Sequence, residues 1–177
     1  SLVTKEVYEL TLILKQTEST LDVALKSLGN MYEDEQRARE QLSEIDKLLS
    51  ECKEKMREFK LPIISDNYFV ELNEANEAIV EIIKELSKKP IVIKTLNTRV
   101  DTARDLVLKL YNTTLNMIKK AKINEAFMVY GNRYRFLHED IARGLDRASN
   151  LFFKGNYDSA LNVCVETLKL VDDNIEG

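Results

Sequence analysis

Proline and glycine are scarce in this sequence. Its 177 residues include only two prolines and five glycines, which is far below the average usage of either residue. Proline and glycine end helices and form many of the tight turns in proteins. Their scarcity therefore predicts long helices joined by few turns.

Residues that carry chemistry are also scarce. His138 is the only histidine, which excludes a metal site built from two histidines, and we expect it to be a surface or structural residue. The sequence contains no glycine-rich phosphate loop, no CxxC pair and no GxSxG nucleophile motif. We therefore expect a protein that is not an enzyme, with no catalytic residue, no metal and no cofactor.

Only two cysteines are present, Cys52 and Cys164. Each falls on the apolar face of a predicted helix, so we expect buried hydrophobic residues rather than disulfide partners or metal ligands. We expect a reducing compartment for the same reason.

Long apolar runs and an excess of positive charge are absent. No run of about 18 apolar residues occurs, and the first residues, SLVTKEVYEL, do not resemble a signal peptide. Lys and Arg number 26 against 30 Asp and Glu, a net charge of -4. This balance predicts no binding of nucleic acid and no attraction to an anionic membrane. We expect a soluble chain that is a piece of a longer protein.

Apolar residues repeat in alternating steps of three and four from Val7 to Phe59. This spacing is typical of helices that pack as in a coiled coil, and only Thr17 and Glu35 depart from it. At about 1.5 Å per residue the helix is roughly 80 Å long. The positions of this seam are Val7, Leu10, Leu14, Thr17, Leu21, Ala24, Leu28, Met31, Glu35, Ala38, Leu42, Ile45, Leu49, Cys52, Met56 and Phe59.

Two further helices follow. Pro62 ends the first helix, Ser65 or Asp66 is placed to cap the second, and Pro90 breaks the pattern after Lys88 or Lys89. The positions in steps of three and four are Phe69, Leu72, Asn76, Ile79, Ile83 and Leu86 in the second helix, and Leu96, Val100, Ala103, Val107, Leu110, Thr114, Met117, Ala121, Asn124 and Met128 in the third.

The last quarter of the chain predicts a helical hairpin. Its first helix is closed by Gly155 and Asn156, and a second helix follows. The apolar positions are Leu137, Ile141, Leu145, Ala148 and Phe152, then Tyr157, Leu161, Cys164, Leu168 and Val171.

The third seam stops in the stretch VYGNRYR, residues 129–135, because its next steps fall on Gly131 and Arg135. One interpretation is a helix end, with Gly131 as a left-handed cap and the arginines solvating the terminus. The other is a recognition patch, since a guanidinium beside tyrosines makes bidentate and stacking contacts.

YGNRYR, after a long helical pattern and before RASNLFFKGNYDSALNVCVETLKLV, resembles the C-terminal part of EzrA-type septation ring formation regulators of low-GC Gram-positive bacteria. The resemblance implies spectrin-like helical bundles, anchored in the membrane by an N-terminal transmembrane helix that this chain does not contain. It also implies a role in cell division at the septum, on the cytoplasmic face of the membrane. The implied partners are the tubulin-like GTPase FtsZ, whose ring assembly is restrained, and other division proteins.

The family writes the patch as QYGNRYR, and its glutamine, asparagine and arginine are implied to place the protein at the division site. Val129 stands here where the family has glutamine, which leaves Asn132 and Arg133 as the residues carried over. The residues that match the motif, and that we expect to bind partners, are Tyr130, Gly131, Asn132, Arg133, Tyr134 and Arg135.

These observations predict an all-α fold: an elongated, spectrin-like antiparallel bundle with a long heptad helix in residues 1–128, then the patch and a helical hairpin in residues 129–177. Side chains beside the first seam favour its folding back onto the second and third helices. They are Ile13, Leu25, Tyr32 and Leu48. The alternative is a structural coiled-coil spacer whose long first helix pairs with a second copy.

Overall fold

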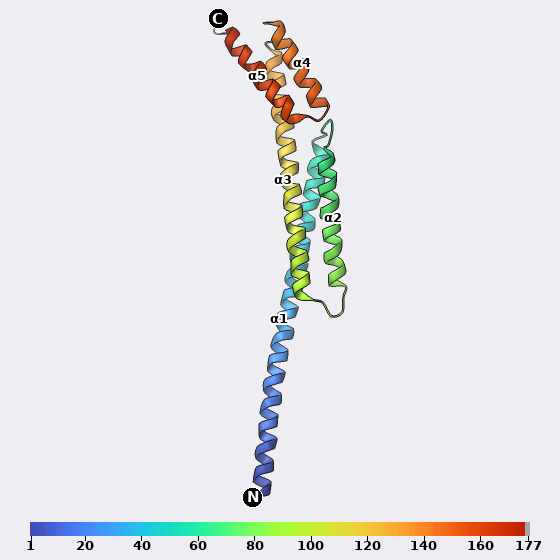
Figure 1. Ribbon diagram of the computed structural model, residues 1–177, viewed down its shortest axis with the longest axis vertical. Helices are drawn as coiled ribbons and strands as arrows, with labels where there is room; N and C mark the ends of the chain where they lie inside the picture. Colours follow the sequence, from blue (N-terminus) through green and yellow to red (C-terminus); the bar gives the residue numbers. More distant parts are fainter. Residues whose placement is uncertain (176–177) are drawn as a thin grey trace.

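The computed structural model describes residues 1–175, which form five α-helices and, within that range, no β-strand. The helices are α1 (Leu2–Glu58), α2 (Asp66–Leu86), α3 (Ile93–Asn132), α4 (Glu139–Phe153) and α5 (Tyr157–Ile175). Figure 1 shows an elongated molecule, with α1 projecting at one end and the α4–α5 hairpin at the other. The predicted all-α class, the long first helix and the C-terminal hairpin are confirmed.

Only the C-terminal part of α1 is packed. Every residue from 1 to 33 is exposed, and the seam residues Leu14 and Leu28 are 64% and 63% exposed. Burial begins at Ala38 and continues through Met56. The prediction that the whole seam folds back is therefore wrong for the first half, including the flanking residues Ile13, Leu25 and Tyr32.

Helix length explains where the packing of α1 stops. The 21 residues of α2 span about 32 Å, so α2 and the antiparallel α3 cover only the part of α1 that lies beside them (Figure 1). Of the four flanking residues, Leu48 alone packs against the core.

The packed part of α1 forms a three-helix bundle with α2 and α3. α3 lies against both other helices, which contact each other little. The predicted break at Pro90 is confirmed, since α2 ends at Leu86 and α3 begins at Ile93. Ser65 is the N-cap residue of α2, although its side chain makes no capping hydrogen bond.

The buried face of α2 lies one residue out of step with the predicted seam. Phe69 and Ile83 of that seam are 52% and 49% exposed. Glu71 and Glu85 are buried instead. The Nζ atom of Lys109 lies 3.9 Å from Glu71 Oε1, and a lysine in the turn that follows α2 forms an ion pair with Glu85. These lysines offset part of the cost of burying the two carboxylates. The apolar residues of the observed face are Tyr68, Ala75, Ile79 and Ile82.

The α4–α5 hairpin is joined to the bundle at its turn. Gly155 has φ +81°, a conformation that favours glycine, and a Cβ there would lie 3.1 Å from Ile63. The Tyr157 hydroxyl donates to the Ile63 carbonyl at 2.6 Å, and the buried Asn124 amide donates to the Tyr157 carbonyl at 3.0 Å. α3 runs unbroken through residue 128, and the division of the chain at that residue stays a prediction.

Both cysteines are free and buried, with Cys52 fully buried and Cys164 1% exposed, which confirms their predicted place in the core. Burial raises the pKa of each thiol. None of the helices in the described part of the chain is long and apolar enough to cross a membrane.

Candidate functional site

The VYGNRYR stretch straddles the end of α3. Residues 129–132 form its last turn, residues 133–137 make turns, and His138 is the N-cap of α4. The His138 Nδ1 atom accepts a hydrogen bond from the Asp140 backbone N–H at 3.1 Å. His138 therefore has the structural role expected of it.

Gly131 is a point of close approach between helices. It lies inside α3 and is buried, and a Cβ there would come within 2.6 Å of Leu145 Cδ2 on α4. The only glycine with a positive φ in the described residues is Gly155, so the predicted left-handed cap at Gly131 is wrong. α3 continues to Asn132 and ends on Arg133 in a right-handed conformation, so no left-handed residue is needed.

Arg135 is used within the molecule. Its Nη1 atom donates to Asp146 Oδ1 on α4 at 2.6 Å, and its Nε and Nη2 atoms donate to Asn132 Oδ1 at 3.3 and 3.2 Å. These bonds tie the end of α3 to α4. They also occupy the acceptor of the Asn132 amide, which leaves its N–H groups for other contacts.

Arg133 presents an unoccupied guanidinium. Its side chain is exposed and has no ion pair or side-chain hydrogen bond among the described residues. It lines a shallow groove of about 420 Å³ along α3 with Val129 and Tyr130, which are 63% and 43% exposed. Lys122 lines the other end of the groove. Its Nζ atom lies 4.1 Å from the centroid of the Phe59 ring.

The two tyrosines of the motif pack against each other beside this groove. The ring centroids of Tyr130 and Tyr134 lie 5.3 Å apart, and Tyr134 also packs against the small core formed by Ile141, Leu145 and Val171. The pKa of Tyr130 is raised, chiefly through the hydrogen-bonding contact of its hydroxyl with that of Tyr134. One ring therefore anchors the other at the surface.

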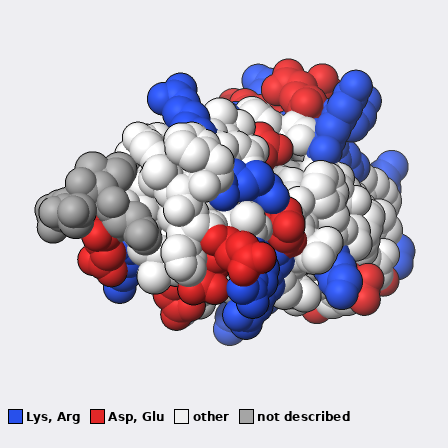
Figure 2. Space-filling view, turned by 90° about the horizontal axis from the view of Figure 1, so that it is seen from above, with Lys and Arg blue, Asp and Glu red and all other residues white. Residues whose placement is uncertain are grey.

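The surface around the site mixes both charge signs. Figure 2 looks down on the end that carries α4 and α5, and shows an uncharged area among basic and acidic side chains. Phe136, 82% exposed, adds an aromatic ring next to the motif. No group of three or more His, Cys, Asp or Glu side chains in the described residues is arranged to hold a metal. The arrangement is suited to contact with another macromolecule.

Sequence reasoning placed the motif but missed its supports. Asp146 holds Arg135 through a hydrogen bond, and Leu145 lies against Gly131. Both residues lie in a different helix from most of the motif. The only signal for Leu145 was its place on the apolar face of the predicted hairpin helix. Nothing in the local sequence pairs Asp146 with Arg135.

Comparison with known proteins agrees with the resemblance carried by the motif. A family model described as septation ring formation regulator, EzrA, matches residues 1–176. A septation ring formation regulator EzrA of Geobacillus sp. (strain WCH70) is 31% identical over 135 residues, which cover 76% of this chain and 24% of that protein. The protein of the same description from Lactococcus lactis subsp. lactis (strain IL1403) is 30% identical over 141 residues, covering 78% of this chain and 24% of the relative.

A third relative covers more of the chain. The septation ring formation regulator EzrA of Enterococcus faecalis (strain ATCC 700802 / V583) is 28% identical over 169 residues, which cover 95% of this chain and 29% of the relative. This chain thus spans about a quarter of the length of the curated relatives it matches. No solved structure matches it.

Proposed function

Because this chain belongs to the EzrA family of septation ring formation regulators, we propose that it regulates bacterial cell division by binding division proteins, FtsZ among them. In this proposal it restrains assembly of the septation ring through contact and has no catalytic activity of its own. The full-length protein acts at the septum on the cytoplasmic face of the membrane, held there by an N-terminal anchor.

The exposed end of α3 is the observation that supports this proposal. Arg133 has no partner among the described residues, and it lies beside the exposed Tyr130 and the free N–H groups of Asn132. Arginine and tyrosine are enriched among the residues that carry most of the binding energy at protein interfaces, and the planar guanidinium can make bidentate and stacking contacts. We propose that Asn132, Arg133 and Tyr130 contact the partner, while Gly131, Tyr134 and Arg135 hold the patch in shape.

A pull-down with purified FtsZ tests the proposal. The chain with Asn132→Ala and Arg133→Ala should be retained at least about tenfold less than the natural chain, in line with the loss of a central arginine contact. Arg104→Ala is the control, because Arg104 is also an exposed arginine but lies on α3 far from the motif, where it pairs with Asp101. Equal retention of all three chains contradicts the patch, and no retention of the natural chain contradicts an FtsZ contact in this part.

Microscopy of the tagged full-length protein provides a second test. The double variant should lose septal placement while the Arg104→Ala protein keeps it. Normal placement of the double variant would rule out the patch as the localising surface.

The alternative function is a structural spacer that pairs through α1. The observation that favours it is the exposed seam of residues 7–31, where Leu10 and Leu21 are 61% and 56% exposed. A coiled-coil seam without a partner helix exposes apolar surface that favours association. Leu14→Asp would abolish such a dimer in a sedimentation experiment and would leave FtsZ binding unchanged.

A further inference from the structure

The outer face of α2 carries an uncharged stripe. Phe69, Val80 and Ile83 are 52%, 47% and 49% exposed, and Leu72 and Asn76 are half-buried between them. At 3.6 residues per turn these five positions share one side of the helix over about 21 Å. The side-chain amide of Asn76 has no hydrogen-bond partner among the described residues. Leu72 packs partly against the bundle core, whereas Phe69, Val80 and Ile83 do not. The stripe thus has the pattern of a helix-packing face that is mostly uncovered.

The stripe is symmetric about Asn76. Leu72 and Val80 each lie four residues from it, and Phe69 and Ile83 each lie seven residues from it. Two copies of α2 placed antiparallel would therefore bring Asn76 opposite Asn76, Leu72 opposite Val80 and Phe69 opposite Ile83. A two-fold interface requires this self-complementarity.

The edge of the stripe has matching charges. Asp66, Asn73, Glu77 and Lys84 lie along one edge, and in an antiparallel pair the same edges of the two helices face each other. With Asn76 at the centre, Lys84 meets Asp66 of the second copy, and Asn73 meets Glu77 of the second copy. Asp66 has no ion pair among the described residues, while Lys84 pairs with Glu81 at an exposed site.

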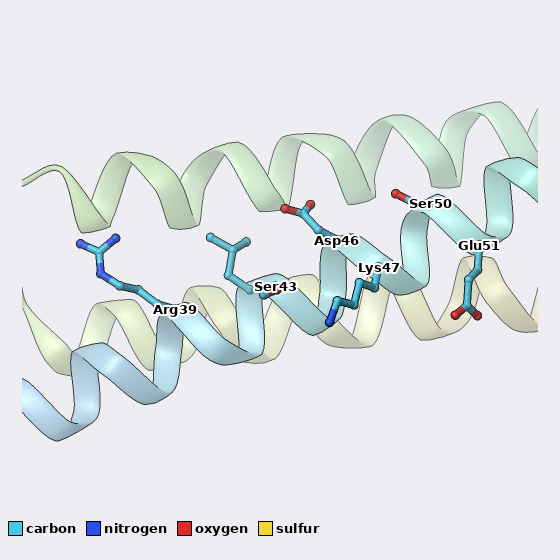
Figure 3. Close-up of a pocket in the computed structure, with 7 residues that line it drawn as sticks. Arg39, Ser43, Asp46, Lys47, Ser50 and Glu51 are labelled. Atoms are coloured by element: carbon cyan, nitrogen blue, oxygen red, sulfur yellow. The ribbon is translucent and has the colours of Figure 1, made fainter.

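α1 covers little of α2 and has a groove of its own. α1 and α2 contact each other little, and a groove of about 640 Å³ follows α1 along residues that include Leu42 and Ser43. In Figure 3, Arg39, Asp46 and Ser50 of this groove point toward the α2 side.

We infer that α2 is a self-association surface, at which two copies of this chain pair antiparallel through Phe69, Leu72, Asn76, Val80 and Ile83. Asn76 sets the register, because a single polar residue at a packing position favours pairing with its own counterpart. A contact over four helical turns is at the small end of specific interfaces. The dimer is therefore expected to form reversibly, in a way that depends on protein concentration.

Cysteine crosslinking tests the register. Asn76→Cys should form a disulfide-linked dimer under mild oxidation, whereas Glu74→Cys, an exposed position outside the stripe, should not. Phe69→Cys and Ile83→Cys should crosslink only when the two variants are mixed. The natural cysteines are buried, so the natural chain is the negative control and should not crosslink. Crosslinking of Phe69→Cys with itself would show a parallel pair and overturn the inference.

Sedimentation at increasing concentration tests the association itself. The natural chain should shift from monomer to dimer between about 10 and 200 µM, and Val80→Asp should weaken the dimer at least tenfold. Its melting temperature should stay within a few degrees of the natural value, because Val80 is half-exposed. A monomer at all concentrations overturns the inference, as does a dimer that survives Val80→Asp but is lost with Leu14→Asp. Neither result alters the FtsZ pull-down, so the two proposals fail separately.

Discussion

The two halves of α1 carry the same heptad pattern and have different surroundings. Residues 2–33 are exposed on all sides, whereas Ala38, Ile45 and Leu49 in the second half are at most 5% exposed. Nothing in the spacing of apolar residues separates the halves. The difference shows that in α1 the heptad pattern reports which face of the helix packs, while the supply of neighbouring helices decides whether it does.

The comparison also explains how the molecule is stabilised. Burial of apolar surface contributes about 25 cal/mol per Å², so the second half of α1 stabilises the fold and the first half does not. The helical state of residues 2–33 rests on local hydrogen bonds and on continuity with the packed half. Substitutions that behave differently in the two halves measure this contrast.

The largest contrast is expected for leucine-to-alanine changes. Leu49→Ala removes a side chain that is 4% exposed and should lower the free energy of unfolding by about 2–5 kcal/mol. Leu14→Ala, at a 64% exposed position of the same seam, should change it by less than about 0.5 kcal/mol. Urea denaturation of both variants checks the contrast. Equal losses would mean that the first half is packed in solution.

Glycine-to-alanine changes should have opposite signs at the two ends of the molecule. Gly131→Ala places a methyl group against Leu145 and should cost about 1–3 kcal/mol through overpacking. Gly29→Ala has no heavy atom within 4 Å of its new methyl group and should stabilise α1 by about 0.5–1 kcal/mol. Thermal melting of both variants gives the answer, and a neutral Gly131→Ala would contradict the close approach of α3 and α4.

The hairpin joint should have a smaller effect. Tyr157→Phe removes the hydroxyl that donates to the Ile63 carbonyl at 2.6 Å and should lower the free energy of unfolding by about 1 kcal/mol. Tyr111→Phe, which removes a hydroxyl without a hydrogen bond to described residues, is the control. If both variants have the same melting temperature, this bond does not hold the hairpin to the bundle.

The smallest effect is expected from alkaline pH. Burial raises the pKa of Cys52, Cys164 and Tyr68. Since the unfolded chain loses these protons first, it binds fewer protons than the folded chain above about pH 8.5, and the stability falls as pH rises. Denaturation at pH 7.5, 9 and 10 should show this decline. A stability that rises over this range would exclude buried, protonated thiols.

Much of the fold was predictable from local signals. Pro62 and Pro90 mark the ends of helices because proline removes a backbone donor, and Gly155 closes α4 in the left-handed conformation. The heptad seam predicted the buried positions of α3 from Leu96 to Asn124. These features depend on a few neighbouring residues, which is why the sequence shows them.

The candidate site was predictable in position and not in structure. The motif predicted that Asn132 and Arg133 lie at the surface, where both are exposed. The role of Gly131 was predicted wrongly, because the residue that leaves no space for a side chain there is a leucine fourteen residues further along the chain. The sequence around Arg135 does not indicate that its guanidinium pairs with Asp146. Such contacts depend on how α4 returns to α3.

The sequence by itself determined the all-α class and the approximate extents of the helices, since periodicity, caps and prolines act within a few residues. The tertiary structure alone decided which apolar faces are covered. It left residues 2–33 of α1 exposed, and it turned α2 so that Glu71 and Glu85 are buried while Phe69 and Ile83 are exposed. The physical reason is that burial depends on the reach and rotation of neighbouring helices, which no local pattern records.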